Sequence, residues 1–282
     1  MEVTMDYCLT FDESVTSQYL NEAAELKVRY NNALNIYHFL LEHPNQRVIL
    51  WFAEDKIFND FERKAVLSLK TEKKINNFVL CLREAKAYEK YKKSNKGEWL
   101  KILEEIKEAE VPFFFEDYVK DFETLHYYIG AGVSDVYIVE NMGFKLPQVS
   151  SICIKSNVKV RALPNICQTP LPCGNIYGFF IRPEDIPIYE RYIDVCEFFN
   201  VEGKQDTYYK IYTQDKHWFG NLQEIIQNLS EPFDSRFTIK QFAEARVKCG
   251  KKCFEGHKCQ ICKRILDLGK TLKDNDIFVD YT

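Results

Sequence analysis

The feature that most constrains this chain is a series of short apolar runs, separated by amphipathic or polar stretches, that extends from residue 5 to residue 199. Short apolar runs bounded by polar or turn-forming residues are typical of buried β-strands. Strands of this kind suit a parallel sheet whose two faces are both covered. The expected strands are Met5–Phe11, Val48–Ala53, Asn77–Leu82, Pro112–Phe115, Asp135–Val139, Val158–Leu163, Ile176–Ile181 and Ile193–Phe199.

Helices are expected between several of these runs. Apolar residues recur at spacings of three and four from Leu20 to Leu41, which predicts a helix over Ser17–Glu42 with Ser17 as a cap. A second helical stripe runs from Trp99 to Ile106, and a helix is expected over Asp121–Ile129. Pro183 is well placed in the first turn of a helical segment over Pro183–Arg191.

This alternation predicts an α/β protein built as a (β/α)8 barrel resembling a TIM barrel, or a close variant of it. A doubly wound open sheet is the alternative, although no G-x-G-x-x-G sequence follows any expected strand. The 282 residues, 46% of them apolar, suffice for a full core. We expect a barrel-like domain over residues 1–235 and a helical C-terminal segment, carrying a cysteine knuckle, over residues 236–282.

Net charge and the N-terminal sequence limit the partners and the cellular location expected for the chain. Thirty-eight basic and 42 acidic residues give a net charge of -4, which argues against attraction of the whole surface to nucleic acid or anionic membrane. No signal peptide is visible over Met1–Thr10, and the longest apolar run is far shorter than the roughly 20 residues of a membrane span. The expected location is the cytoplasm, where the ten cysteines remain thiols or metal ligands.

The strongest local motif is Cys249-x3-Cys253-x5-Cys259-x2-Cys262, interleaved with Gly250 and Gly256. Four closely spaced thiolates converge on one tetrahedral ion or one cluster at little cost in loop-closure entropy. The spacing does not decide between Zn²⁺ and a [4Fe-4S] cluster. His257 is an alternative ligand. The alternative to a metal site is a group of free thiols.

The segment around these cysteines is basic. It carries seven Lys and Arg residues between Arg246 and Arg264 against one acid, Glu255. Positive charge stabilises thiolates and supports metal binding. The same charge also suits contact with phosphates, so the knuckle is a candidate contact for a protein or nucleic-acid partner.

The remaining cysteines form two further groups. Cys8, Cys81, Cys153 and Cys196 lie within or beside apolar runs and are expected in the core. Cys167 and Cys173 flank a proline-rich segment, where they are either structural or presented to a ligand.

Acidic residues follow several expected strands. Asp12, Glu54, Glu116 and Glu140 come directly after the first, second, fourth and fifth of them. If the strands are parallel, these carboxylates ring the carboxyl end of the barrel, where barrel enzymes build their active sites. They are candidates for acid/base catalysis or metal ligation, although Asp and Glu at such turns also cap helices. No nucleophile elbow, Walker loop or H-E-x-x-H pattern is present.

The stretch LHYYIGAGVSDVYIVENMGFKLPQV, Leu125–Val149, resembles a barrel segment of the collagenase-like peptidase family (family U, number thirty-two). The resemblance extends from about Pro112 through Phe180 and more loosely to Phe199. It implies a barrel fold and a cysteine-ligated centre, because several relatives hold a four-cysteine iron–sulfur cluster and others are described as peptidases. The family's mid-chain cysteine signature is not recognisable in this sequence, so neither activity nor cluster ligands carry over residue by residue.

Two functions are consistent with these observations. The first is a cytoplasmic, metal-binding, peptidase-like barrel enzyme that acts on a peptide or a nucleic-acid-linked substrate at the acidic rim. The second is a non-enzymatic binding or structural protein whose zinc knuckle docks a protein or nucleic-acid partner.

Overall fold

The structure is a computed structural model that describes residues 5–11, 19–83, 96–119, 121–138, 146–164, 181–198 and 204–215. The chain divides into two compact units. One, called the barrel unit below, comprises Asp6–Ile138 and Cys153–Arg161; the other comprises Met1–Met5, Val139–Ile152 and Ala162–Thr282.

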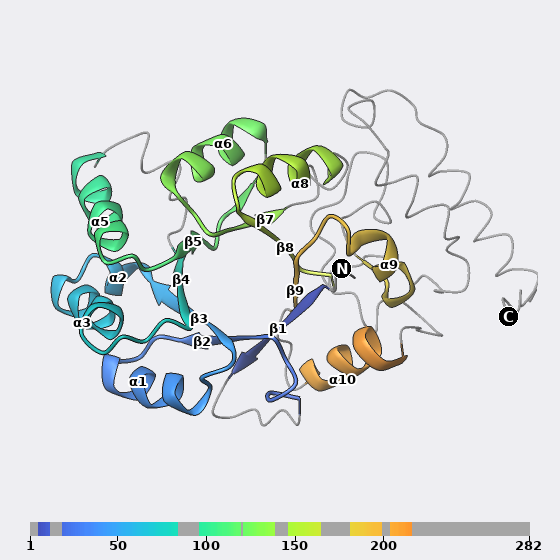
Figure 1. The fold of residues 1–282 in the computed structure, drawn as a ribbon, viewed down its shortest axis with the longest axis horizontal. Helices are drawn as coiled ribbons and strands as arrows, with labels where there is room; N and C mark the ends of the chain where they lie inside the picture. The colour runs from blue at the N-terminus through green and yellow to red at the C-terminus, as the bar shows by residue number, and fades with distance from the viewer. Residues whose placement is uncertain are drawn as a thin grey trace, which may run out of the picture. The chain divides into compact units, whose positions relative to one another are not determined.

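The barrel unit is built on parallel strands (Figure 1). In order along the sheet they read β5-β4-β3-β2-β1 and β8-β7-β6, and each ladder between these neighbours within either row is parallel. β5 also packs beside β7, and the Ser134 N–H donates to the Phe113 carbonyl at 2.8 Å. The row of strands therefore curves back on itself into a nearly closed, TIM-barrel-like arrangement. The strands are β1 Asp6–Phe11, β2 Glu25–Arg29, β3 Arg47–Ala53, β4 Phe78–Arg83, β5 Phe113–Phe115, β6 Tyr118–Val119, β7 Asp135–Ile138 and β8 Lys159–Ala162, with β9 Val195–Glu197 in the other unit.

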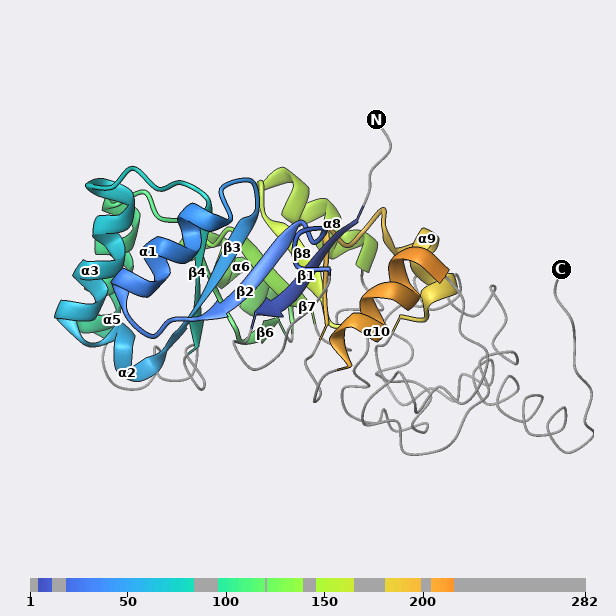
Figure 2. The same cartoon turned by 90° about the horizontal axis from the view of Figure 1, so that it is seen from below.

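Helices follow the strands and cover the outside of the barrel unit, as Figures 1 and 2 show for α1, α3, α5 and α6. Each turns an apolar stripe inward, for example Ile36 and Leu40 of α1 and Ile102 and Ile106 of α5, all at most 2% exposed. The apolar core thus lies between sheet and helices. The helices are α1 Ala33–Glu42, α2 Glu54–Ile57, α3 Asp60–Thr71, α5 Lys96–Glu108, α6 Phe122–Ala131, α8 Leu146–Lys155, α9 Ile186–Tyr189 and α10 Gln205–Lys210, with short turns η2 Pro183–Asp185 and η3 Ile211–Asp215.

The described part of the other unit has its own packing. Phe198, which follows β9, packs against Tyr212 with ring centroids 5.2 Å apart. The Tyr212 hydroxyl donates to the Ile181 carbonyl at 2.5 Å, and Arg182 binds both carboxylate oxygens of Asp185 at 2.6 Å. Pro183 begins η2, which confirms its expected place in a first helical turn.

The barrel-like α/β prediction is confirmed for the described residues. Six of the expected strands correspond to β1, β3, β4, β5, β7 and β8, and a seventh to β9. Cys8, Cys81, Cys153 and Cys196 are fully buried thiols, as expected of core residues. No helix among the described residues has the length and apolarity needed to cross a membrane.

The expected single helix over Ser17–Glu42 is wrong. The segment contains strand β2, Glu25–Arg29, and only then helix α1, which is capped by the Asn32 side chain accepting from the Asn35 N–H at 2.9 Å. In β2 the side chains of Leu26 and Val28 alternate with charged ones, which is the period of a strand. The spacing of apolar residues across the whole segment concealed this shorter alternation.

Several predictions fall outside the described residues. They are the strand over Ile176–Ile181 except its last residue, the thiols Cys167 and Cys173, the four-cysteine group, and the boundary between residues 235 and 236.

Candidate active site at the carboxyl end of the barrel

Charged side chains from several strands meet inside the barrel unit. Charged residues open five of the strands, and further polar side chains follow along the same inward faces. They form two groups, which we call the amino-end network and the carboxyl-end cluster. The amino-end network is Asp6, Glu25, Arg47, Asp135, Lys159 and Arg161, and the carboxyl-end cluster is Lys27, Trp51, Glu116 and Tyr137.

The amino-end network joins strands that are distant in sequence. The Arg47 guanidinium donates to Glu25 at 2.8 Å and to both oxygens of Asp135 at 2.9 and 2.5 Å. Arg161, fully buried, donates to Glu25 at 2.6 Å and to Asp135 at 3.1 Å. Lys159 donates to Asp6 at 3.1 Å. Two carboxylates are thus each shared by two arginines.

These contacts keep the buried carboxylates ionised. Burial by itself raises the pKa of Asp135, but hydrogen bonds from Arg47 and the charge of Arg161 outweigh it and lower that pKa to about 2. Burial likewise raises the pKa of Glu25, and the positive charges of Arg161 and Arg47 overcome this and leave it lowered. The three acidic and three basic side chains of the network thus compensate one another's charge.

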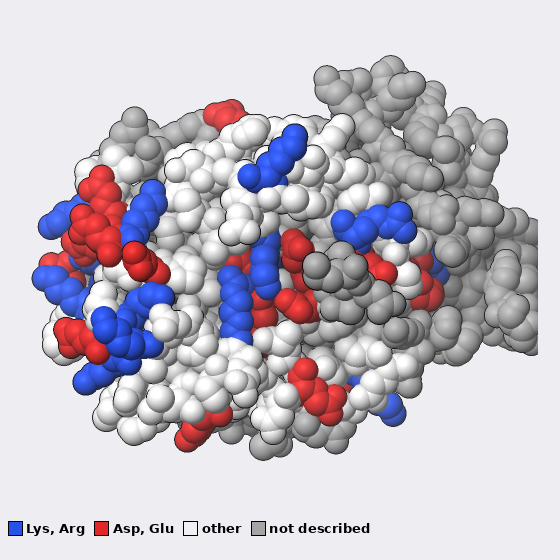
Figure 3. Space-filling model, viewed as in Figure 1, with Lys and Arg blue, Asp and Glu red and all other residues white. Residues whose placement is uncertain are grey.

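Position assigns this network a structural role. Glu25, Arg47, Asp135 and Lys159 are the first residues of their strands, so they lie at the amino end of the barrel. That end of a TIM-type barrel serves stability, whereas active sites form at the carboxyl end. Figure 3 shows basic and acidic side chains gathered over the strands in the middle of the face drawn there.

The carboxyl-end cluster centres on Glu116. Its Oε2 accepts from the Trp51 indole N–H at 2.9 Å, and its Oε1 accepts from the Lys27 ammonium at 3.4 Å. Lys27 also lies 3.4 Å from the Tyr137 hydroxyl, which makes a link from β2 across to β7. One carboxylate is therefore held by an indole and an ammonium from two neighbouring strands.

Local structure explains why Glu116 takes this position. It follows β5 directly, and its backbone N–H donates to the Leu82 carbonyl of β4 at 3.1 Å, so the chain stays fixed to the sheet beyond the strand. Its side chain keeps 31% of its exposure, whereas that of Lys27 keeps 13%. The Glu116 side chain is thus accessible to solvent, whereas that of its partner Lys27 is largely buried.

Aromatic rings contact the basic side chains of this region. The Arg29 guanidinium stacks over the Trp51 ring at 5.4 Å, and the Lys27 ammonium lies 5.7 Å from the centre of the Tyr137 ring. Tyr118 of β6 packs edge-on against Tyr137 with ring centroids 5.9 Å apart. Rings of this kind exclude water from the charged groups that they cover, which strengthens the electrostatic contacts of those groups.

The structure describes only some of the four acidic residues expected at the rim. Glu116 is described and belongs to the carboxyl-end cluster. Glu54 opens α2 directly after β3, but its side chain is not described. Asp12 and Glu140 lie outside the described residues.

Sequence reasoning missed the partners of Glu116. The helical spacing over Ser17–Glu42 predicts a helix at Lys27, and the apolar runs predict strands at Trp51 and Tyr137 without indicating a contact with Glu116. The available signal was the alternation of Glu25, Lys27 and Arg29, since charges at every second position mark a polar inner face.

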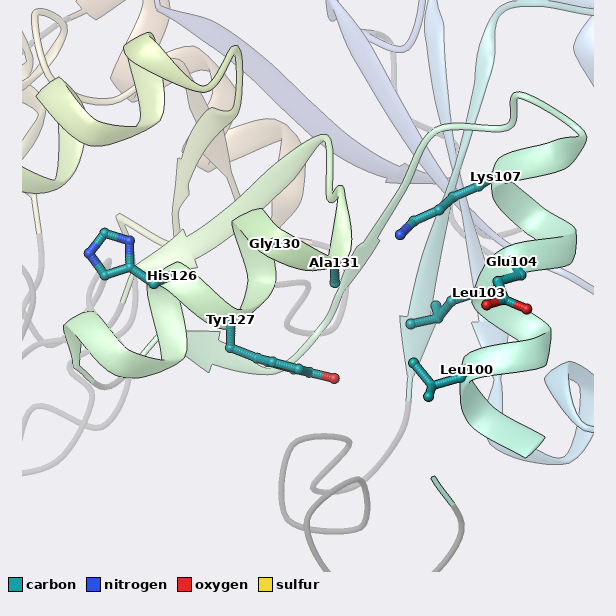
Figure 4. Close-up of a pocket in the computed structure, with 8 residues that line it drawn as sticks. All are labelled: Leu100, Leu103, Glu104, Lys107, His126, Tyr127, Gly130 and Ala131. Carbon is teal, nitrogen blue, oxygen red and sulfur yellow. The ribbon is translucent and has the colours of Figure 1, made fainter. Parts of the chain in front are cut away.

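A separate groove lies on the outside of the barrel unit, between α5 and α6 (Figure 4). Its volume is about 310 Å³, and Lys107 and Tyr127 extend into the space between the two helices. It contains no candidate acid/base residue from the sequence prediction. The lining residues are Leu100, Leu103, Glu104, Lys107, His126, Tyr127, Gly130 and Ala131.

No group of three or more metal-ligating side chains comes together within the described ranges. The predicted ligands Cys249, Cys253, Cys259 and Cys262 lie outside those ranges, so the metal site stays a prediction.

No protein-family model matches the chain, and no curated protein matches it either. Several solved structures are similar to it, among them the three that follow. The 3-keto-L-gulonate-6-phosphate decarboxylase of Vibrio cholerae O1 biovar El Tor is 10% identical, with a TM-score of 0.45 over 76% of this chain and 99% of that one. Xylanase10C of Cellvibrio japonicus, in complex with xylopentaose, is 10% identical, with a TM-score of 0.42 over 88% and 68%.

The third is the EAL enzyme Bd1971 bound to cAMP and cyclic-di-GMP, 13% identical with a TM-score of 0.33 over 49% of this chain. This chain spans about two-fifths of that enzyme, 39% of its length. We take no function from these three proteins, because none is more than 13% identical.

Proposed function

We propose that the chain is an enzyme whose active site is the carboxyl-end cluster, with Glu116 as the general acid/base. The observation that carries this proposal is one carboxylate, 31% exposed, that an indole N–H and an ammonium hold at the functional end of a barrel. A catalytic acid/base must be both fixed in orientation and accessible to substrate. Glu116 meets both conditions.

The residues around Glu116 have distinct roles in this proposal. The Trp51 indole fixes Oε2, so proton exchange with substrate takes place at Oε1, the oxygen on the side of Lys27. The Lys27 ammonium stabilises negative charge that develops on a substrate oxygen, as positive groups do in enclosed sites. Asp12, Glu54 and Glu140, which the sequence predicts at the same rim, are further acid/base candidates.

The substrate in this proposal is a peptide or a nucleic-acid-linked molecule. This follows the resemblance of Leu125–Val149 to the collagenase-like peptidases, some of whose relatives act on RNA. Molecules of both classes contain polar bonds whose cleavage is assisted by a general acid/base such as a carboxylate.

The proposal includes a metal centre in the C-terminal segment. Cys249, Cys253, Cys259 and Cys262 supply four thiolates to Zn²⁺ or to a [4Fe-4S] cluster, and the surrounding lysines and arginines compensate their charge. Elemental analysis and an absorption spectrum of anaerobically purified protein decide between the two. One zinc per colourless chain excludes the cluster, and a brown, iron-containing protein excludes zinc.

Glu116→Gln tests the catalytic proposal. A proteome-derived peptide mixture and a mixture of oligoribonucleotides are incubated separately with the protein, and products are identified by mass spectrometry. We expect turnover of one mixture to fall by about a hundredfold or more in Glu116→Gln, because a positioned acid/base contributes 10²–10⁴. The isosteric amide keeps the Trp51 contact.

The matched control is Glu104→Gln in the outer groove, which should keep full turnover. Equal turnover by Glu116→Gln and the native chain contradicts the proposal. If neither mixture is altered by the native chain, the protein is better described as a binding protein, whose basic knuckle contacts a protein or nucleic acid.

A further inference from the structure

Helix α1 differs from α3 and α5, which also cover the outside of the barrel unit, in its lack of charge (Figure 1). No Asp, Glu, Lys or Arg occurs from Ala33 to Leu41, and Glu42 ends the helix. In α5, by contrast, Lys101 and Glu104 are both exposed. A surface helix normally carries charged side chains on its outer face, and a helix that is apolar on several faces is expected to be covered.

The exposed side of α1 carries a row of apolar side chains. Leu34, Tyr37 and Leu41, which we call the outer stripe, follow one another at spacings of three and four residues. Leu34 keeps 65% of its exposure and Leu41 keeps 50%, whereas Ile36 and Leu40, on a different side of the helix, are buried. Single exposed apolar side chains are ordinary, but a group of them marks an interaction surface.

The neighbouring helix adds to this apolar surface. Phe61 lies in the first turn of α3, which packs beside α1, and it keeps 79% of its exposure. Its values and those of the outer stripe are among the largest exposures of apolar side chains in the part of the chain that the structure describes. Covering these two helix surfaces therefore removes several large apolar side chains from water at once.

We infer that the outer stripe is the interface of a homodimer, in which α1 packs against α1 of a second copy of this chain. Apolar residues three and four apart form the seam at which two helices interlock, and a second copy supplies such a helix. A two-fold interface brings the same surface of both copies together. A stripe without charge meets its own copy without repulsion between like charges.

The charges at the two ends of α1 favour an antiparallel pair of helices. The first turn of α1 contains no acidic residue, and the exposed Glu42 lies at the other end. An antiparallel arrangement places Glu42 of each copy near the amino end of the other copy's α1, where backbone N–H groups favour negative charge. A parallel arrangement brings the two Glu42 carboxylates together, where they repel each other.

The dimer should be reversible, because its contact is centred on one helix of each copy. Standard interfaces bury about 800 Å² per partner, and smaller ones belong to weak or transient complexes. In sedimentation velocity of the full chain between about 1 and about 300 µM, we expect the average mass to rise from that of one chain toward that of two. A native chain that stays monomeric over this range overturns the inference and leaves the outer stripe to a different partner.

Leu41→Lys tests whether the outer stripe is the interface. It places a charge in the apolar seam of both copies, so the dissociation constant should rise by about tenfold or more. The matched control is Ile154→Lys on α8, because Ile154 is 70% exposed and lies outside the stripe; its dissociation constant should stay that of the native chain. Both positions are exposed, so circular dichroism should remain native. Undiminished dimerisation of Leu41→Lys overturns α1 as the interface.

A double variant tests the direction of the two helices. In an antiparallel pair, position 34 of one copy lies near position 41 of the other. Leu34→Glu combined with Leu41→Lys then places opposite charges together at both ends of the interface and should recover much of the affinity that Leu41→Lys alone loses. In a parallel pair the same changes bring like charges together. Dimerisation weaker in the double variant than in Leu41→Lys overturns the antiparallel arrangement.

Discussion

At the scale of single residues, the most consequential side chains are the buried charges of the amino-end network. Asp135 and Arg161 are both without exposed side-chain surface, and each contacts two oppositely charged partners. Removing charge from water is costly, and the cost is recovered only when every partner is in place. Loss of a single buried charged side chain from the network should therefore lower the free energy of unfolding substantially.

Asp135 should make folding stability depend on pH. Its pKa of about 2 in the folded chain lies below its ordinary value of 3.8, so the ionised form stabilises the fold above about pH 4. This contribution, about 2 kcal/mol, disappears as the pH falls from about 4 to 2. In chemical unfolding at stepped pH, Asp135→Asn should lose most of this slope, and the exposed Glu104→Gln should retain it. An unchanged slope in Asp135→Asn contradicts the assignment.

Arg161 should be far more important for stability than its neighbour Lys159. Arg161→Met leaves Glu25 and Asp135 buried with one partner fewer, so unfolding free energy should fall by about 3–5 kcal/mol. Lys159→Met removes a half-exposed partner and should cost less than about 1 kcal/mol. Urea unfolding of both variants provides the measurement. Equal losses indicate that burial of Arg161 is not the controlling factor.

At the scale of elements, local sequence and wider pattern disagree at one place. Most strands were predictable, because runs such as Val48–Ala53 and Asn77–Leu82 are short, apolar and bounded by polar residues. β2 was not, because its strand-like alternation lasts only five residues and continues into the apolar stripe of α1. Asn32 was the local signal of a new helix start.

The end of α6 offers a matched pair of glycines. Gly132 ends the helix at a φ of 85°, a left-handed conformation, and a Cβ there meets Lys107 Cε at 3.2 Å. Gly130 lies in the helix with nothing within 4 Å of an added Cβ. Gly132→Ala should destabilise by about 1 kcal/mol, and Gly130→Ala should stabilise by about 0.5–1 kcal/mol.

Thermal unfolding followed by circular dichroism measures this difference as shifts of Tm in opposite directions. Shifts of the same sign in the two variants contradict the assigned role of Gly132.

At the scale of the whole molecule, the candidate site was only half predictable. Glu116 could be found because the end of a strand is visible in sequence and carboxyl ends of parallel strands share one rim. Its partners Lys27 and Tyr137 lie 110 residues apart in sequence. Their proximity depends on curvature and closure of the sheet, which no local pattern encodes.

The ten cysteines give a prediction for the whole chain. Cys8, Cys81, Cys153 and Cys196 are fully buried, so they should react with Ellman's reagent only after denaturation. If the C-terminal four hold a metal, they should become reactive in the native protein when a chelator, or an oxidant in the case of a cluster, removes it. Counting reactive thiols before metal removal, after it, and in guanidinium separates these populations. Fast reaction of the four C-terminal thiols before metal removal contradicts metal binding.

The ion pairs inside the barrel also bear on how its strands align during folding. A slip of β2 by one residue turns its apolar side chains into the barrel, and the loss of burial opposes it. A slip by two residues keeps every side chain on its proper face, so burial alone does not oppose it. In one of its two directions, that slip places Lys27 beside Arg47, in the position where Glu25 now pairs with it. Repulsion between two enclosed cations then penalises a misalignment that hydrophobic patterning tolerates, so the buried charges favour the correct strand register over it.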